Sequence, residues 1–139
     1  MKPVILSAAL LASMVPAVFA AEQLDECMDN AENQAAMTQC AAQAYQASDA
    51  ELNEVFHDTR QRLGDDDDTR RLLRDAERAW IAFRDAECSF VSSAVGGGSA
   101  YSMVYDLCLD DLTQKRVEDL RYYLDCDEGD MSCPVPAAD

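Results

Sequence analysis

Six cysteines that follow an apolar N-terminal segment constrain the fold of this chain more than any other feature. Apolar and small residues run from Val4 to Val15 behind Lys2, and small residues surround the bond after Ala20. This pattern is typical of a secretory signal that is removed from the mature protein. An even number of cysteines in a short exported chain indicates three disulfides, although the count alone does not fix their pairing. All six lie after the predicted cut: Cys27, Cys40, Cys88, Cys108, Cys126 and Cys133.

The predicted mature protein has the size of one domain. Removing residues 1–20 as a signal peptide leaves 119 of the 139 residues, a scale at which a hydrophobic core benefits from cross-links. The apolar segment is shorter than the roughly 20 residues that span a bilayer as a helix. Ala21 rather than a cysteine follows the cut, so we expect no lipid anchor. We therefore expect a soluble periplasmic or secreted protein.

The charge of the chain excludes some partners. Its formal net charge is −16, and the predicted signal removes only the base Lys2, which leaves −17. Residues 21–59 hold nine acidic residues and no Lys or Arg. A nucleic acid or an anionic membrane surface is a poor partner for such a protein, whereas a cationic protein is a suitable one.

The spacing of apolar residues predicts an all-α fold. Apolar residues recur three and four apart over 34–63, over 67–95 and from 99 to 124, and glycines follow the first two segments. We predict a small antiparallel three-helix bundle stapled by disulfides, with a domain over 21–124 and an irregular acidic tail over 125–139. The apolar stripe of the second helix consists of Leu72, Leu73, Ala76, Ala79, Trp80, Phe83, Ala86 and Phe90.

Two helix starts carry side chains suited to capping. The run Asp65–Asp68 precedes the second helix, where unpaired N–H groups and the helix dipole favour acidic residues. The alternative is a metal site, but consecutive residues on a helix point around the axis and do not converge. Ser99 is the expected cap of the third helix. Ser48 and Glu51 fit a capping box that would divide the first helix, yet the apolar phase continues through them, so we favour one helix.

Helix geometry bears on two of the three cysteine pairs that we predict. Cys88 and Cys108 lie about 12 and 15 Å from the glycine turn at 96–98, so their heights match across a hairpin. Cys27 and Cys40 would be about 20 Å apart on one helix, so their pairing requires a turn within residues 29–33. Cys126 and Cys133 then close a short loop in the tail.

Four segments of the sequence resemble one known family. They are AYQASDAELN at 44–53, AERAWIAFRDAEC at 76–88, GGSAYSMVYDLC at 97–108 and LTQKRVEDL at 112–120. In this order and spacing they resemble the LprI-type lysozyme inhibitor N-terminal domain family. The resemblance implies a helical, exported bacterial module that inhibits lysozyme. It places the family motif at Leu52, Asn53, Trp80, Phe83, Arg84, Asp85, Thr113, Arg116 and Leu120.

The polar residues of the motif also have an explanation in packing. Arg84 follows Phe83 and is one turn beyond Trp80, so its guanidinium can reach a carboxylate on a neighbouring helix. The functional alternative is that Arg84 orders an acidic surface that a partner contacts. Asn53 and Arg116 also lie beside apolar stripes, where interhelical hydrogen bonds explain them. Trp80 is expected in the core.

Residue types and spacing indicate no catalytic, metal or cofactor site. His57 is the only histidine and has no nucleophile near it in a recognisable motif. Asp85 and Glu87 are two apart on a helix and point in different directions. The cysteines suit disulfides better than zinc, because an exported chain is oxidised and no tight Cys-x-x-Cys pair is present. We therefore expect a non-enzymatic protein without a cofactor.

Two surfaces are candidates for contact with a partner. The turn from Gly96 to Tyr101 combines a flexible backbone with polar and aromatic side chains, although it also suits a plain connection between helices. The first helix carries acidic residues suited to a cationic partner such as lysozyme. The alternatives to lysozyme capture are an envelope protein of structural or stress role and an acidic cation binder. The candidate residues are Gly97, Gly98, Ser99, Tyr101, Glu51, Glu54 and Asp58.

Overall fold

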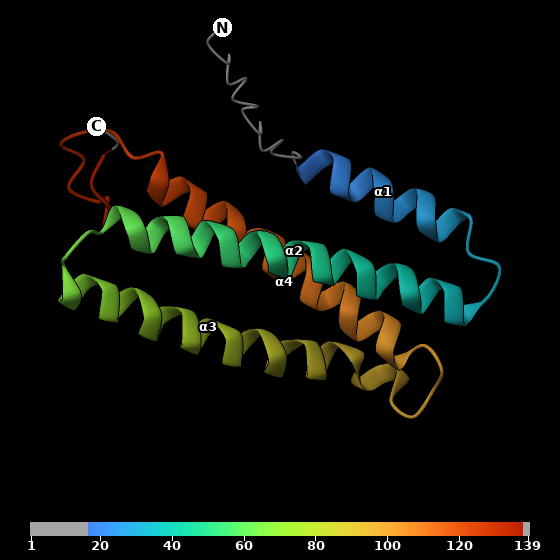
Figure 1. Ribbon diagram of the computed structural model, residues 1–139. Helices are drawn as coiled ribbons and strands as arrows, with labels where there is room; N and C mark the ends of the chain where they lie inside the picture. The colour runs from blue at the N-terminus through green and yellow to red at the C-terminus, as the bar shows by residue number, and fades with distance from the viewer. Residues whose placement is uncertain (1–16, 138–139) are drawn as a thin grey trace, which may run out of the picture.

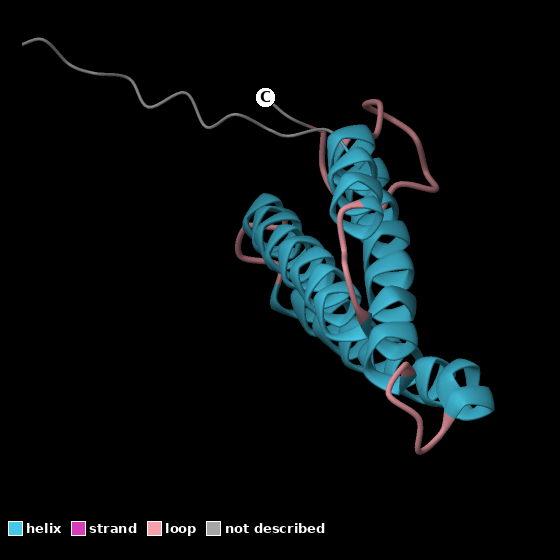
Figure 2. Ribbon diagram, turned by 90° about the vertical axis from the view of Figure 1, so that its right-hand side faces the viewer, coloured by secondary structure: helices cyan, strands magenta, loops and turns pink. Residues whose placement is uncertain are grey.

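The computed structural model describes residues 17–137 and consists of helices joined by short loops (Figure 1). The elements are α1 (Ala17–Asp29), α2 (Gln34–Arg62), α3 (Asp67–Ser92), a 3-10 helix (Ser93–Val95) and α4 (Tyr101–Leu124). The described residues contain no strand (Figure 2). The predicted all-α class is confirmed, and the three predicted helices correspond to α2, α3 and α4.

Helix α1 is an addition to the three predicted helices. Its apolar residues are few beyond the predicted signal cut, so the sequence pattern did not indicate it. The predicted cut after Ala20 falls within α1, while residues 1–16 of the predicted signal lie outside the described residues. A turn at 30–33 returns the chain from α1 to α2, as the pairing of Cys27 with Cys40 required.

Side-chain caps begin α2 and α3. The Asn33 side chain accepts a hydrogen bond of 3.0 Å from the Ala36 backbone N–H, and Asp66 accepts one of 2.9 Å from the Thr69 N–H. These bonds, together with one from the Thr69 hydroxyl, lower the pKa of Asp66. The capping interpretation of the aspartate run is confirmed, and the described residues contain no cluster of three or more potential metal ligands.

The capping predictions for the two serines had different outcomes. Helix α2 is continuous, and the Ser48 hydroxyl donates to the Tyr45 carbonyl within it at 3.1 Å. The prediction that Ser99 caps the last helix was wrong, because Ala100 occupies the cap position and makes no side-chain bond. The Tyr101 N–H donates to the Gly98 carbonyl at 3.2 Å instead. A backbone turn therefore takes the place of the predicted side-chain cap.

The three predicted disulfides are present. Cys27–Cys40 joins α1 to α2, Cys88–Cys108 joins α3 to α4, and Cys126–Cys133 closes a loop after α4, with Cα–Cα distances of 5.8, 5.5 and 5.9 Å. Cys88 is fully buried. The matched heights across the α3–α4 hairpin are thus confirmed.

The apolar core lies chiefly between α2 and α4. Leu52 and Val55 of α2 pack with Val117 and Leu120 of α4, and these four side chains are buried. α2 and α4 form the largest helix–helix contact, and α3 packs on α4. Trp80 of α3 packs against this cluster but is only half-buried, so its predicted place inside the core is corrected to the edge of the core.

The stripe predicted as the buried face of α3 is mostly exposed. Leu72, Phe83 and Phe90 have exposed fractions of 61%, 55% and 74%. The residues of α3 that are buried are Glu77, Arg84, Cys88 and Ser92. The prediction assumed that apolar residues mark the inner face. Instead α3 meets the bundle through paired polar groups together with Leu73 and Trp80, and the rest of the stripe lies on the outside.

The position of Trp80 sets the expected cost of removing its ring. We expect Trp80→Ala to lower the free energy of unfolding by about 2 kcal/mol, below the roughly 3–5 kcal/mol typical of a fully buried tryptophan. Chemical denaturation followed by far-UV circular dichroism measures this change. A loss above about 4 kcal/mol would contradict the half-buried placement.

Candidate functional site

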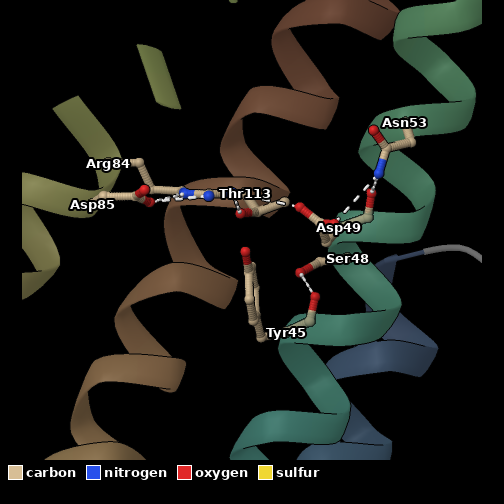
Figure 3. A network of polar contacts seen from close by, with 7 residues as sticks. All are labelled: Tyr45, Ser48, Asp49, Asn53, Arg84, Asp85 and Thr113. Atoms are coloured by element: carbon tan, nitrogen blue, oxygen red, sulfur yellow. Dashed lines mark hydrogen bonds and ion pairs between the residues drawn. The ribbon is translucent and has the colours of Figure 1, made fainter. Parts of the chain in front are cut away.

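Polar residues from three helices meet in a layer centred on Arg84, and those from α3 and α4 belong to the family motif (Figure 3). Arg84 lies on α3 and is 6% exposed. Its Nε donates to Asp85 Oδ1 at 3.0 Å, and its Nη1 donates to Thr113 Oγ1 of α4 at 3.3 Å. The same Nη1 lies 3.5 Å from Oδ1 of Asp49 on α2. One guanidinium therefore contacts side chains of α2, α3 and α4.

Aromatic rings complete the surroundings of Arg84. Its Cζ lies 5.4 Å from the ring centroid of Tyr45 and 5.2 Å from that of Trp80, distances suited to cation–π contact. Burial raises the pKa of the Tyr45 hydroxyl, and the positive charge of Arg84 partly offsets this effect. The guanidinium thus has ring and carboxylate partners on several sides.

A second ion pair also lies close to Trp80. Arg116 of α4 donates from Nε to Glu77 Oε2 of α3 at 2.9 Å, and the two side chains are 11% and 10% exposed. The Arg116 Cζ is 5.9 Å from the Trp80 ring centroid. Trp80 therefore contacts two arginines, and both arginines connect α3 to α4.

The arrangement of the motif favours a structural role. Arg84 and Arg116 direct their donors to groups of the protein itself, and Leu52 and Leu120 lie in the core. Asn53 is exposed and bonds to the Asp49 carbonyl within α2 at 2.8 Å. The interhelical bond predicted for Asn53 is therefore wrong, while that for Arg116 is confirmed. Phe83 is exposed and takes no part in this layer.

Three members of the polar layer were missed in the sequence. Tyr45, Asp49 and Glu77 supply the ring and the carboxylates that the arginines contact. Tyr45, Asp49 and Asn53 are spaced by four residues on one helix, which places them on a common face. That spacing is a signal for shared contacts, but it does not identify the arginine opposite them.

The glycine turn lies at one end of the α3–α4 hairpin. Gly97 has φ +78°, a conformation that favours glycine. Ser99 and Tyr101 are exposed, and the Tyr101 ring stacks on Tyr105 with centroids 6.1 Å apart. The candidate side chains of this turn are therefore exposed, and the Tyr101 ring is stacked on the Tyr105 ring.

The acidic candidates of α2 do not share one environment. Glu54 and Asp58 are exposed, whereas Glu51 is partly buried and pairs with Arg121 of α4. His57 is exposed on the same helix, where its Nε2 lies 2.7 Å from Gln61 Nε2. Glu54 and Asp58 remain available to a partner, but Glu51 also connects helices.

Comparison with known proteins agrees with this architecture. The family model described as "Lysozyme inhibitor LprI" matches residues 26–120. An uncharacterized protein, R02472 of Rhizobium meliloti (strain 1021), is 36% identical over 101 residues, which are 65% of this chain and 73% of that protein. A crystal structure of a DUF1311 family protein from Pseudomonas putida KT2440 has a TM-score of 0.59 at 27% identity, covering 62% of this chain and 88% of that one.

Fold and motif together define a class, a disulfide-linked helical bundle whose helices are joined by a buried arginine layer. The family model covers most of the chain, including this layer and two of the three disulfides. The protein belongs to the LprI family. No helix among the described residues is both long enough and apolar enough to cross a membrane.

Proposed function

We propose that the protein is an exported binding module that captures a cationic lysozyme-type muramidase and inhibits it without catalysis. The observation that carries this proposal is the match of the lysozyme-inhibitor family model to residues 26–120. The predicted signal at residues 1–20 supports export to the periplasm or the medium. The three disulfides suit that oxidising setting.

Charge supports a cationic target. The chain has a formal net charge of −16, and Glu54 and Asp58 present free carboxylates on α2. Opposite net charges increase the rate of association, and the increase falls as salt screens them. Long-range attraction alone does not block an active-site cleft, so a local element has to occupy it.

The glycine turn at 96–101 is the element that we assign to the cleft. It projects from the end of the α3–α4 hairpin, and exposed Ser99 and Tyr101 provide polar and aromatic contact. Tyrosine is enriched at binding interfaces because its ring contributes a large contact area and its hydroxyl a hydrogen bond. In this proposal the acidic surface speeds encounter and the turn slows dissociation.

A turbidity assay tests the proposal directly. Purified, oxidised mature protein is added to lysozymes of different classes acting on bacterial cell walls, and we expect inhibition near one-to-one stoichiometry. The alternative is an envelope protein of structural or stress role without lysozyme contact, which the structural role of the motif residues favours. Absence of inhibition and of binding for every lysozyme class would support that alternative.

Two sets of substitutions separate steering from occlusion. We expect Glu54→Gln with Asp58→Asn to slow association and reduce its salt dependence, because these carboxylates face solvent. Ser99→Ala with Tyr101→Ala should chiefly accelerate dissociation. Surface plasmon resonance at several salt concentrations measures both rates.

A matched control distinguishes local from overall charge. Asp127→Asn with Glu128→Gln removes the same charge from the exposed tail. If the tail variant slows association as much as the α2 variant, steering is a property of net charge and not of α2. Unchanged dissociation of the turn variant would reject the turn as the inhibitory element.

A further inference from the structure

Six residues of the apolar stripe of α3, without Leu73 and Trp80, form a narrower stripe that no described element covers. Its positions are spaced by four, three, four, three and four residues, which is the repeat of a coiled-coil seam. Every one of them is exposed, including the three large side chains with exposed fractions of 61%, 55% and 74%. The stripe spans about 27 Å of helix. Its members are Leu72, Ala76, Ala79, Phe83, Ala86 and Phe90.

The stripe is complementary to itself when a second copy runs antiparallel. With the two-fold axis beside residue 81, Leu72 faces Phe90 of the other copy, and Ala76 faces Ala86. Phe83 then faces Ala79, so that a large side chain meets a small one in two of the layers. Alternation of large and small residues is the condition for close packing between helices.

The order of residues along the stripe favours the antiparallel direction. A parallel pair in register would bring Phe83 beside Phe83 and Ala79 beside Ala79, so large side chains would crowd one another and small ones would leave space unfilled. The antiparallel pair instead places each Phe83 against Ala79 of the other copy.

We propose that the protein forms a symmetric homodimer in which the α3 stripes of two copies pack antiparallel. The stripe lies about 130°, more than a third of a turn, around α3 from the face that holds Glu77 and Arg84. The two bundles therefore lie side by side across the α3 pair. In Figure 1, α3 forms the lower edge of the described molecule, which leaves this helix accessible to a second copy.

Solution mass tests the dimer. Sedimentation equilibrium of the oxidised mature protein should show a dimer whose fraction grows with concentration. Phe83→Glu should raise the dissociation constant of this dimer by at least about 100-fold, because both Phe83 rings are lost from the interface. Ile81→Glu is the matched control, since Ile81 is an exposed apolar residue on the opposite side of α3, with an exposed fraction of 38%. Circular dichroism checks that both variants retain their helices.

Cross-linking tests the direction of the helices. The six native cysteines are paired, so a single introduced cysteine reacts selectively with a short bismaleimide. Ala82→Cys lies near the two-fold axis and should give a covalent dimer, whereas Ser89→Cys places the two thiols about 24 Å apart along α3 and should not. Cross-linking at both positions would indicate a parallel pair and overturn the proposal.

Other results would also overturn it. A monomer at all concentrations up to the millimolar range rejects the dimer. Equal weakening by Ile81→Glu would place the contact on another face. If the protein stays monomeric and Phe83→Glu instead weakens lysozyme capture, the stripe binds the enzyme and not a second copy.

Discussion

Replacing Glu77 with leucine is expected to lower the free energy of unfolding by about 3 kcal/mol or more. The substitution leaves the charge of Arg116 nearly buried without its carboxylate, and loss of one partner of a buried ion pair is strongly destabilising. Glu77 and Arg116 are 10% and 11% exposed, so water does not replace the missing partner readily. Denaturant unfolding at neutral pH measures the loss.

The double variant Glu77→Leu with Arg116→Met should recover most of that stability. It removes both charges and fills their space with apolar groups, which brings the expected free energy of unfolding to within about 1 kcal/mol of the parent. If the double variant is as unstable as the single one, the single variant fails through lost packing rather than through an unpaired charge.

Truncation of Leu120 should be similarly costly. Leu120 is fully buried between α2 and α4, and Leu120→Ala is expected to lower the free energy of unfolding by about 3–4 kcal/mol through lost apolar burial and the cavity that remains. Leu72→Ala is the control, because the Leu72 side chain has an exposed fraction of 61%. At low micromolar protein the control should change stability by less than about 0.5 kcal/mol.

An equal effect of the two leucine substitutions would contradict the description of the core. The comparison keeps the chemistry constant and changes only the burial of the side chain. It also tests whether α3 meets the bundle through its polar face, since Leu72 would be as important as Leu120 if the apolar stripe faced inward.

Helix positions and cysteine pairs were predictable because they depend on local geometry. Residue spacing defined α2, α3 and α4, and the rise per residue placed Cys88 and Cys108 at similar heights. Helix α1 was not predicted, since few of its residues beyond the predicted cut are apolar. The inner face of α3 was predicted incorrectly, because periodicity identifies an apolar face but not which face meets the neighbouring helices.

The polar layer was predictable only in part. The sequence indicated that Arg84 reaches a carboxylate on another helix, and Asp49 is that carboxylate. Prediction of the partners Tyr45 and Glu77 would have required knowledge of how the helices are placed relative to one another, and no single segment contains that information. Glu51 was expected to be free for a partner, but its pairing with Arg121 became visible only with the packing of α4 on α2.

The polar layer has a consequence for oxidative folding. A shift of α3 by one helical turn would move Arg84 about 5.4 Å away from Thr113 and Glu77 equally far from Arg116, leaving buried charges without partners. The same shift would separate Cys88 from Cys108, whose Cα atoms are 5.5 Å apart in the aligned state. The arginine contacts thus favour the alignment in which these two thiols meet, so the pairing of Cys88 with Cys108 depends on residues that contain no sulfur.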